Sequence, residues 1–129
     1  MQVMSFLLGE AVTRRPDGLR DLMGVAVKDV IIAPGAPPPY QWSAVLFIAV
    51  LCGPEDAGSH ETVLQWREPD ETETVLQTHV LSVESVPGRQ WIEWVPPLIL
   101  PVRRPGLYVL RWRWDDMWIR SMGISFRTP

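Results

Sequence analysis

Apolar side chains recur at every second position along much of the chain, which is the spacing of a β-strand with one buried face. The clearest example follows the turn residues Pro105-Gly106, where four large apolar residues share one face: Tyr108, Leu110, Trp112 and Trp114. The chain then turns at Asp115-Asp116 and returns through a second series: Trp118, Met122, Ile124 and Phe126. This stretch is predicted to form a β-hairpin that supplies much of the apolar surface available for a core or an interface.

Other short apolar stretches are separated by proline and glycine, and none of them sustains a helical period. The 129 residues include 13 prolines and nine glycines, whose placement divides the chain into seven to nine strands. Outside the hairpin, the expected strands are Gln2 to Val12, Leu19 to Val30, Gln41 to Cys52, Glu61 to Arg67, Thr72 to Val83 and Gln90 to Val95, and Leu98 to Val102 leads into the hairpin. This spacing is typical of an antiparallel β-sandwich, immunoglobulin-like or related, and the length predicts one domain over residues 1–129.

Three segments predict how the strands are arranged. Gln41 to Cys52 is apolar at both odd and even positions, which favours the centre of a sheet covered on both faces. Pro34 to Pro39 contains four prolines, so a stiff extended connector is expected to cross from one sheet to the other. Pro105-Gly106-Leu107-Tyr108 resembles the tyrosine corner of β-sandwiches, in which the hydroxyl bonds back to the preceding connection.

The register of the C-terminal hairpin follows from which side chains would share a face. A two-residue loop at Asp115-Asp116 would place Arg111 opposite Arg120, where like charges repel. A three-residue loop from Asp115 to Met117 pairs Trp114 with Trp118, Leu110 with Met122 and Tyr108 with Ile124. We predict this second register, because a shift of one residue would move the apolar series to the other face.

Charge is distributed unevenly along the chain, although the net charge is only −3. Gly53 to Glu84 carries eight acidic residues against Arg67 alone, whereas Val102 to Pro129 carries six arginines against Asp115 and Asp116. The two segments either lie beside each other as neighbouring strands or present separate charged surfaces. We favour internal pairing, because oppositely charged cross-strand pairs are common in sheets.

Arginine and tryptophan are concentrated near the tip of the predicted hairpin, and both are enriched at protein-binding hot spots. The candidate partner-binding residues are Arg111, Trp112, Arg113, Trp114, Trp118 and Arg120. The alternative is that the tryptophans close the open end of the sandwich core, which is the commoner fate of aromatic residues at strand spacing.

No constellation of residues supports catalysis or a resident cofactor. The serines lack a nucleophile-elbow context, and the chain has no glycine-rich phosphate loop. Cys52 follows a strongly apolar stretch, so it is not expected to act as a nucleophile. His60 and His79 are not at metal-ligand spacing. The acidic pairs of the predicted loops match no calcium motif: Glu55-Asp56, Asp70-Glu71 and Asp115-Asp116. We therefore expect no enzyme, no cofactor and no metal site.

The sequence also argues against nucleic acid and membranes as partners. The acidic balance and the absence of lysine near the tryptophans weaken any comparison with single-strand nucleic-acid platforms. The longest apolar run, Ala44 to Cys52, is far shorter than the roughly 20 residues of a membrane helix. Met1 to Val12 lacks the basic region of a secretory signal, and one cysteine cannot form an intramolecular disulfide. A cytoplasmic protein is expected.

Four short motifs are spread over most of the chain: Phe6-Leu7-Leu8-Gly9-Glu10-Ala11, the turn Asp17 to Leu19, Met23-Gly24 and Pro105-Gly106-Leu107-Tyr108. Together they resemble a family of small uncharacterised bacterial proteins that carries a domain-of-unknown-function label. The resemblance implies an immunoglobulin-like or related β-sandwich of unknown activity, with no catalytic residues to transfer.

The predicted function is binding without catalysis, to another protein or to copies of the same chain in a homo-oligomer, through the C-terminal hairpin. A second interpretation is a sandwich that binds a small ligand or carbohydrate through the tryptophans of the tip. A third is a structural component of a larger assembly. A large apolar area between chains would favour the first, and a concave groove lined by Trp112, Trp114 or Trp118 would favour the second.

Overall fold

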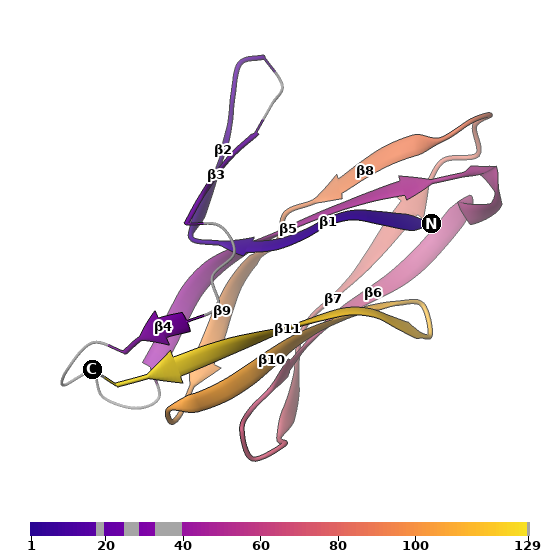
Figure 1. Cartoon of the computed structure of the whole chain (residues 1–129). Coiled ribbons are helices and arrows are strands. Elements are labelled where there is room, and N and C mark those ends of the chain that lie inside the picture. Colours follow the sequence, from indigo (N-terminus) through magenta and orange to yellow (C-terminus); the bar gives the residue numbers. More distant parts are fainter. Residues whose placement is uncertain (18–19, 25–28, 33–39, 129) are drawn as a thin grey trace.

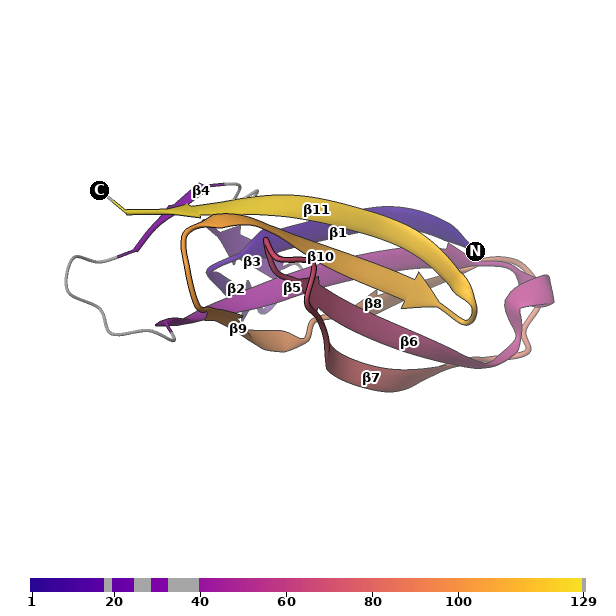
Figure 2. The same ribbon diagram turned by 90° about the horizontal axis from the view of Figure 1, so that it is seen from below.

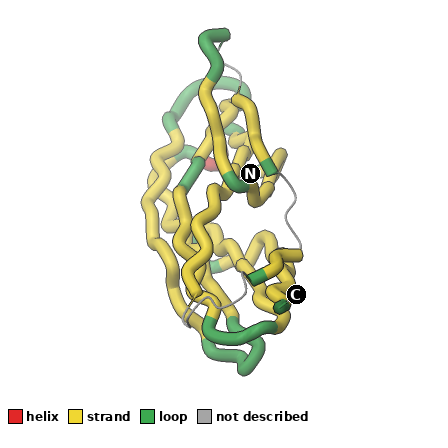
Figure 3. The backbone as a smooth tube through the Cα atoms, turned by 90° about the vertical axis from the view of Figure 1, so that its left-hand side faces the viewer, coloured by secondary structure: helices red, strands yellow, loops and turns green. Residues whose placement is uncertain are grey.

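The structure is a computed structural model that describes residues 1–17, 20–24, 29–32 and 40–128 (Figure 1). The described strands are β1 (Gln2–Gly9), β2 (Ala11–Arg14), β3 (Arg20–Met23), β4 (Asp29–Ile31), β5 (Tyr40–Cys52), β6 (Gly58–Arg67), β7 (Glu73–Val83), β8 (Gln90–Trp94), β9 (Pro97–Val102), β10 (Gly106–Trp114) and β11 (Met117–Arg127). Within these ranges the only helical element is one 3-10 turn, η1 (Pro54–Asp56) (Figure 3). The predicted all-β class is confirmed.

Nine of these strands form two sheets that pack face to face, and β2 and β3 form a separate hairpin that projects away from them (Figure 1). One sheet has the order β1-β5-β8, and β9 pairs with the other half of β5. The second sheet has the order β4-β11-β10-β6-β7, in which only β4 and β11 are parallel. This is the predicted β-sandwich.

The core lies between the two sheets and receives the inward side chains of both. β5 has β1 on one side and β8 and β9 on the other, which confirms the predicted central strand. Its residues Leu46, Ile48 and Val50 are buried in one cluster with side chains of the second sheet: Leu64, Trp66, Tyr108, Leu110, Trp112, Ile124 and Phe126. The hairpin β10–β11 therefore supplies much of the core, as its apolar alternation predicts.

Tyr108, near the start of β10, forms the predicted corner. Its hydroxyl donates to the carbonyl oxygen of Arg104 at 2.9 Å and accepts the backbone N–H of Arg103 at 3.2 Å. The ring is fully buried and stacks on Trp66, with 5.0 Å between ring centroids. One buried side chain thus satisfies polar backbone groups of the β9–β10 connection.

Both predicted N-terminal strands are divided in the structure. β1 ends at Gly9 and the chain bends at Glu10, so Gln2 to Val12 is not one strand. The stretch from Leu19 to Val30 is interrupted at Gly24, which has a φ of +63° and ends β3. β3 and β4 then belong to different sheets, so Leu19 to Val30 is not one strand.

Two predicted connections have different outcomes. Pro34 to Pro39 lies outside the described residues, but β4 and β5 on either side of it belong to different sheets, as the prediction of a crossing requires. The connection between β5 and β6, where the acidic pair Glu55-Asp56 was predicted to lie in a loop, contains η1, and β6 begins at Gly58.

The C-terminal hairpin combines two registers. In its body, Tyr108 pairs with Ile124, Leu110 with Met122 and Trp112 with Arg120, as predicted. At the tip, Trp114 pairs with Met117 around a two-residue turn, so the predicted pairing of Trp114 with Trp118 is wrong. Ile119 is the extra residue at the bulge that joins the two registers. The bulge also removes the repulsion expected for a two-residue turn, because Arg111 lies opposite Ser121.

Candidate interaction surface on the C-terminal hairpin

The six predicted binding residues lie in three different environments. Trp112 is fully buried and Trp114 is 7% exposed, because even-numbered residues of β10 point into the sandwich. These two tryptophans belong to the core, as the alternative interpretation expected, and are not available to contact a partner. Arg111, Arg113 and Trp118 lie on the opposite, outer face, and Arg120 lies apart from them at the edge of the sandwich.

We call Arg111, Arg113 and Trp118 the arginine–tryptophan patch. The guanidinium carbon of Arg111 lies 4.0 Å from the Trp118 ring centroid, and that of Arg113 lies 5.8 Å away. A guanidinium over an indole is attracted by the ring electrons. Trp118 is nevertheless 41% exposed, so the patch presents a large aromatic surface to solvent.

Neighbouring strands hold the two arginines in place. Arg113 Nη2 donates to Glu61 Oε1 at 2.7 Å, and Arg111 Nη1 donates to Gln65 Oε1 at 3.1 Å. Both partners lie on β6, which pairs with β10. Side chains that are already ordered lose less entropy on binding than free ones, so a contact made through this patch would cost little side-chain entropy.

The acidic and basic halves of the chain pair internally, as predicted. Four ion pairs between an arginine and a carboxylate join them: Arg103–Glu68, Arg104–Asp70, Arg111–Glu73 and Arg113–Glu61. They form because β10 and the connection before it lie next to β6 and the β6–β7 turn. The outer face of the five-stranded sheet therefore carries both signs of charge side by side.

Exposed apolar side chains continue the patch across the same face. One row of paired residues runs Trp118, Arg113, Val63 and Thr78, and the next runs Ser121, Arg111, Gln65 and Val75. Val75 and Val80 on β7 are each 57% exposed. The outer face from β11 to β7 thus combines aromatic, aliphatic and charged side chains.

A second polar cluster lies at the tip of the hairpin, around His60 of β6. The ring bonds to Asp115 Oδ2 through Nδ1 at 2.7 Å and to the carbonyl oxygen of Asp56 through Nε2. Both partners can only accept hydrogen bonds, so both are satisfied only when both ring nitrogens carry protons. The geometry therefore favours the charged imidazolium.

Opposing effects act on the titration of this cluster. Burial disfavours the charged ring of His60, but the bonds to Asp115 and Asp56 and the charges of these residues outweigh it and raise the pKa of His60. Burial also opposes ionisation of Asp56, whereas its bonds to the Met1 ammonium and the Gly53 N–H lower the pKa of Asp56 overall. The cluster is therefore charged at mildly acidic pH.

A pocket of about 440 Å³ opens beside this cluster and is lined in part by Asp56, His60, Trp114 and Asp116. His60 stacks on Trp114, with 4.6 Å between ring centroids, and covers one face of the indole. Two of the three acidic pairs predicted in loops, Glu55-Asp56 and Asp115-Asp116, contribute residues to this pocket. In the third pair, Asp70 forms an ion pair with Arg104 away from the pocket. Among the described residues, no group of three or more His, Cys, Asp or Glu side chains is arranged to hold a metal ion.

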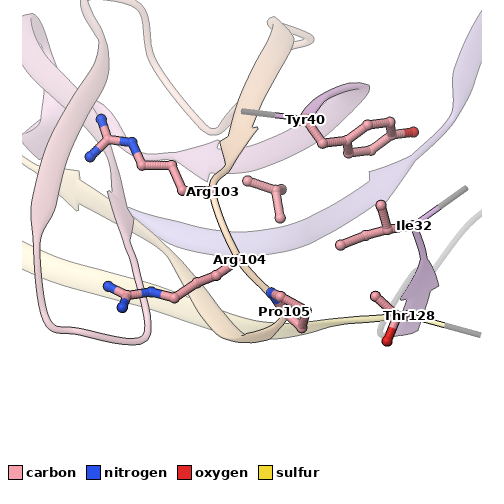
Figure 4. Close-up of a pocket in the computed structure, with 7 residues that line it drawn as sticks. Ile32, Tyr40, Arg103, Arg104, Pro105 and Thr128 are labelled. Atoms are coloured by element: carbon pink, nitrogen blue, oxygen red, sulfur yellow. The ribbon is translucent and has the colours of Figure 1, made fainter. Parts of the chain in front are cut away.

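A smaller pocket of about 160 Å³ lies at the other end of the hairpin, between Ile32, Tyr40 and Pro105 (Figure 4). The guanidinium groups of Arg103 and Arg104 point away from it, toward their acidic partners. Cys52 is fully buried. Burial, and to a lesser degree the nearby Asp56 carboxylate, raises the pKa of its thiol, which disfavours the nucleophilic thiolate.

No protein-family model matches the chain, and no curated protein sequence matches it. The family resemblance of the short motifs therefore stays a prediction.

In the part of the chain that the structure describes, no helix has the length and apolar character needed to cross a membrane.

Two features of this surface were not predicted from the sequence. The outward position of Trp118 depends on the bulge at Ile119, for which the only signal was the unfavourable pairing of Arg111 with Arg120 in the simple register. The polar cluster around His60 joins this residue to Asp115, which is 55 positions away, and no local sequence pattern indicates that contact.

Proposed function

We propose that this protein is a non-catalytic interaction module that binds protein through the outer face of its five-stranded sheet, with the arginine–tryptophan patch at the centre. The observation that carries the proposal is the exposed ring of Trp118, held on the sheet by Arg111 and Arg113. Trp and Arg contribute most to binding energy in protein interfaces, and an ordered aromatic anchor reduces the entropy lost on association.

The partner that fits this face most simply is a second copy of the chain. Arg111 and Arg113 lie beside Glu61 and Glu73 on one sheet face. A two-fold related copy can place the arginines of one face near the acidic residues of the other, and the exposed valines of β7 add apolar area. Such a contact uses one self-complementary surface and closes as a dimer.

Light scattering after size exclusion, over a range of protein concentrations, tests this proposal. Trp118→Ala is compared with Trp91→Ala, a matched control because Trp91 is 53% exposed on β8 of the other sheet. We expect a concentration-dependent dimer for the wild type and for Trp91→Ala, and a monomer for folded Trp118→Ala. A wild type that stays monomeric at about 1 mM, or equal dimerisation of both variants, would contradict the proposal.

Binding of a small ligand or carbohydrate at the tip is the second candidate, because the pocket beside His60 is concave and is lined in part by Trp114. The indole is 7% exposed and one of its faces is covered by His60, so little ring surface is left for stacking. Titration with simple sugars, followed by tryptophan fluorescence, is expected to show no saturable change. A saturable change that is lost in Asp116→Asn would favour this candidate instead.

A further inference from the structure

The sandwich has an open side between β1 and β11, which run along the same side of the molecule (Figure 2). β11 is paired on its outer edge with β4 only from Ser125 to Arg127. From Met117 to Ile124, no strand of the described chain occupies that edge. A groove of about 310 Å³ lies here, with Val3, Met4 and Phe6 on one wall and Arg120, Ser121 and Met122 on the other.

The groove has apolar side chains of β1 beside an unpaired strand edge, and its exposed lining is more polar than apolar. Phe6 stacks on the buried Trp112, with 5.8 Å between ring centroids, and Met4 is 45% exposed. The buried Nε1 of Trp112 has no acceptor among the described residues. Unpaired backbone groups along a strand edge are a ready template for another strand. β1 is a poorer template, because its ladder is interrupted by an irregularity between Val3 and Ser5.

Arg120 supplies the charge that selects an occupant. Its side chain is exposed and donates to the carbonyl oxygen of Ile119, and none of the described carboxylates forms an ion pair with it. Seven residues further along β11, Arg127 binds Asp29 of β4 at 2.9 Å. β4 thus shows how a strand is held at this edge, by parallel pairing together with an acid–arginine contact.

We propose that this groove binds an extended peptide segment of a partner protein, which adds to β11 in line with β4. Its apolar side chains face Phe6 and Met122, and an acidic side chain faces Arg120. Strand addition draws affinity from main-chain hydrogen bonds and specificity from alternate side chains. A second copy that pairs through the same two strands fits less well, because β1 and β11 contain no acidic residue and two β11 edges would bring their arginines together.

This inference rests on the proposed function only in treating the protein as a binding module, and it uses a different surface. The test measures fluorescence anisotropy with two pools of seven-residue peptides that alternate apolar and polar residues. One pool has Asp or Glu at the central groove-facing position, and the matched pool has Lys there. The wild type is compared with Arg120→Glu and with Trp118→Ala, after melting curves establish that all three are folded.

We expect the acidic pool to bind the wild type about tenfold more tightly than the lysine pool, and Arg120→Glu to reverse that preference. Trp118→Ala should bind like the wild type. Backbone N-methylation of the peptides should abolish binding, and amide exchange should slow from Arg120 to Ile124. Equal binding of both pools, binding that survives N-methylation, or no binding at about 1 mM would overturn the proposal. Self-association lost in Arg120→Glu but kept in Trp118→Ala would assign the groove to a second copy, and would also overturn it.

Discussion

Trp66 and Trp112 allow a matched test of how buried polar atoms affect the stability of this sandwich. Both indoles are fully buried, and they lie on the neighbouring strands β6 and β10. Trp66 Nε1 donates to the carbonyl oxygen of Pro101 at 2.9 Å, whereas Trp112 Nε1 has no acceptor among the described residues. Replacement of each by Phe removes the same atoms from environments that differ in hydrogen bonding.

The expected difference follows from those two contacts. Each substitution loses packing of part of an indole, on the order of 2 kcal/mol, and this loss is common to both. Trp66→Phe also leaves the Pro101 oxygen unpaired, which costs about 1–3 kcal/mol. Trp112→Phe instead removes a donor that already bears a desolvation cost of similar size. Trp66→Phe should therefore lower the free energy of unfolding by about 3 kcal/mol more than Trp112→Phe does.

Urea denaturation at neutral pH measures this difference, with tryptophan fluorescence and circular dichroism as independent probes. Equal slopes against denaturant for the two variants would show that both report stability and not a change in the unfolded state. A difference of 3 kcal/mol corresponds to about 10 °C in melting temperature for a chain of this length. Equal losses, or a larger loss for Trp112→Phe, would refute the assignment of Trp112 Nε1 as an unpaired donor.

Three further predictions concern single contacts. Tyr108→Phe removes the hydroxyl that satisfies two backbone groups before β10 and should lower the free energy of unfolding by about 1–3 kcal/mol in urea denaturation. Gly106→Ala should destabilise by about 2 kcal/mol or more, because Gly106 has a φ of +147° and a Cβ there would lie 2.6 Å from Pro69 Cγ; an unchanged midpoint would contradict this. The fold raises the pKa of His60, so the charged ring stabilises the folded state. This contribution to the free energy of unfolding is complete below the unfolded pKa of about 6.5 and is lost as pH rises through the folded pKa. As pH rises above about 6.5, the melting temperature should fall more in the wild type than in His60→Gln, and parallel curves would contradict the charged His60 cluster.

Features encoded in local pattern were predictable from the sequence. The double-sided apolar run from Gln41 to Cys52 indicates a central strand, and the Pro-Gly turn followed by Tyr108 indicates the corner. The opposite charges of the segments Gly53 to Glu84 and Val102 to Pro129 indicate that these segments are neighbours. In each case a few consecutive residues carry the physical cause.

Features that depend on distant parts of the chain were not predictable in the same way. The alternation from Gln2 to Val12 continues across Glu10, yet the chain leaves the sheet there. Whether a strand such as β4 joins one sheet or the other depends on which edge is free, and here that edge belongs to β11. The partners of His60 likewise come from η1 and from the hairpin turn, which are brought together only by the fold.

The bulge at Ile119 links the core of this protein to its candidate binding surfaces. In a three-residue turn, Trp118 would lie opposite Trp114 and point inward, whereas a simple two-residue register would turn Met122 and Ile124 out of the core. One extra residue allows Met122 and Ile124 to stay inward while Trp118 faces solvent beside Arg111 and Arg113. The same change of register leaves Arg120 at the groove beside β1. The exposure of Trp118 is therefore a consequence of the bulge, which places the indole on the face where the proposed contact is made.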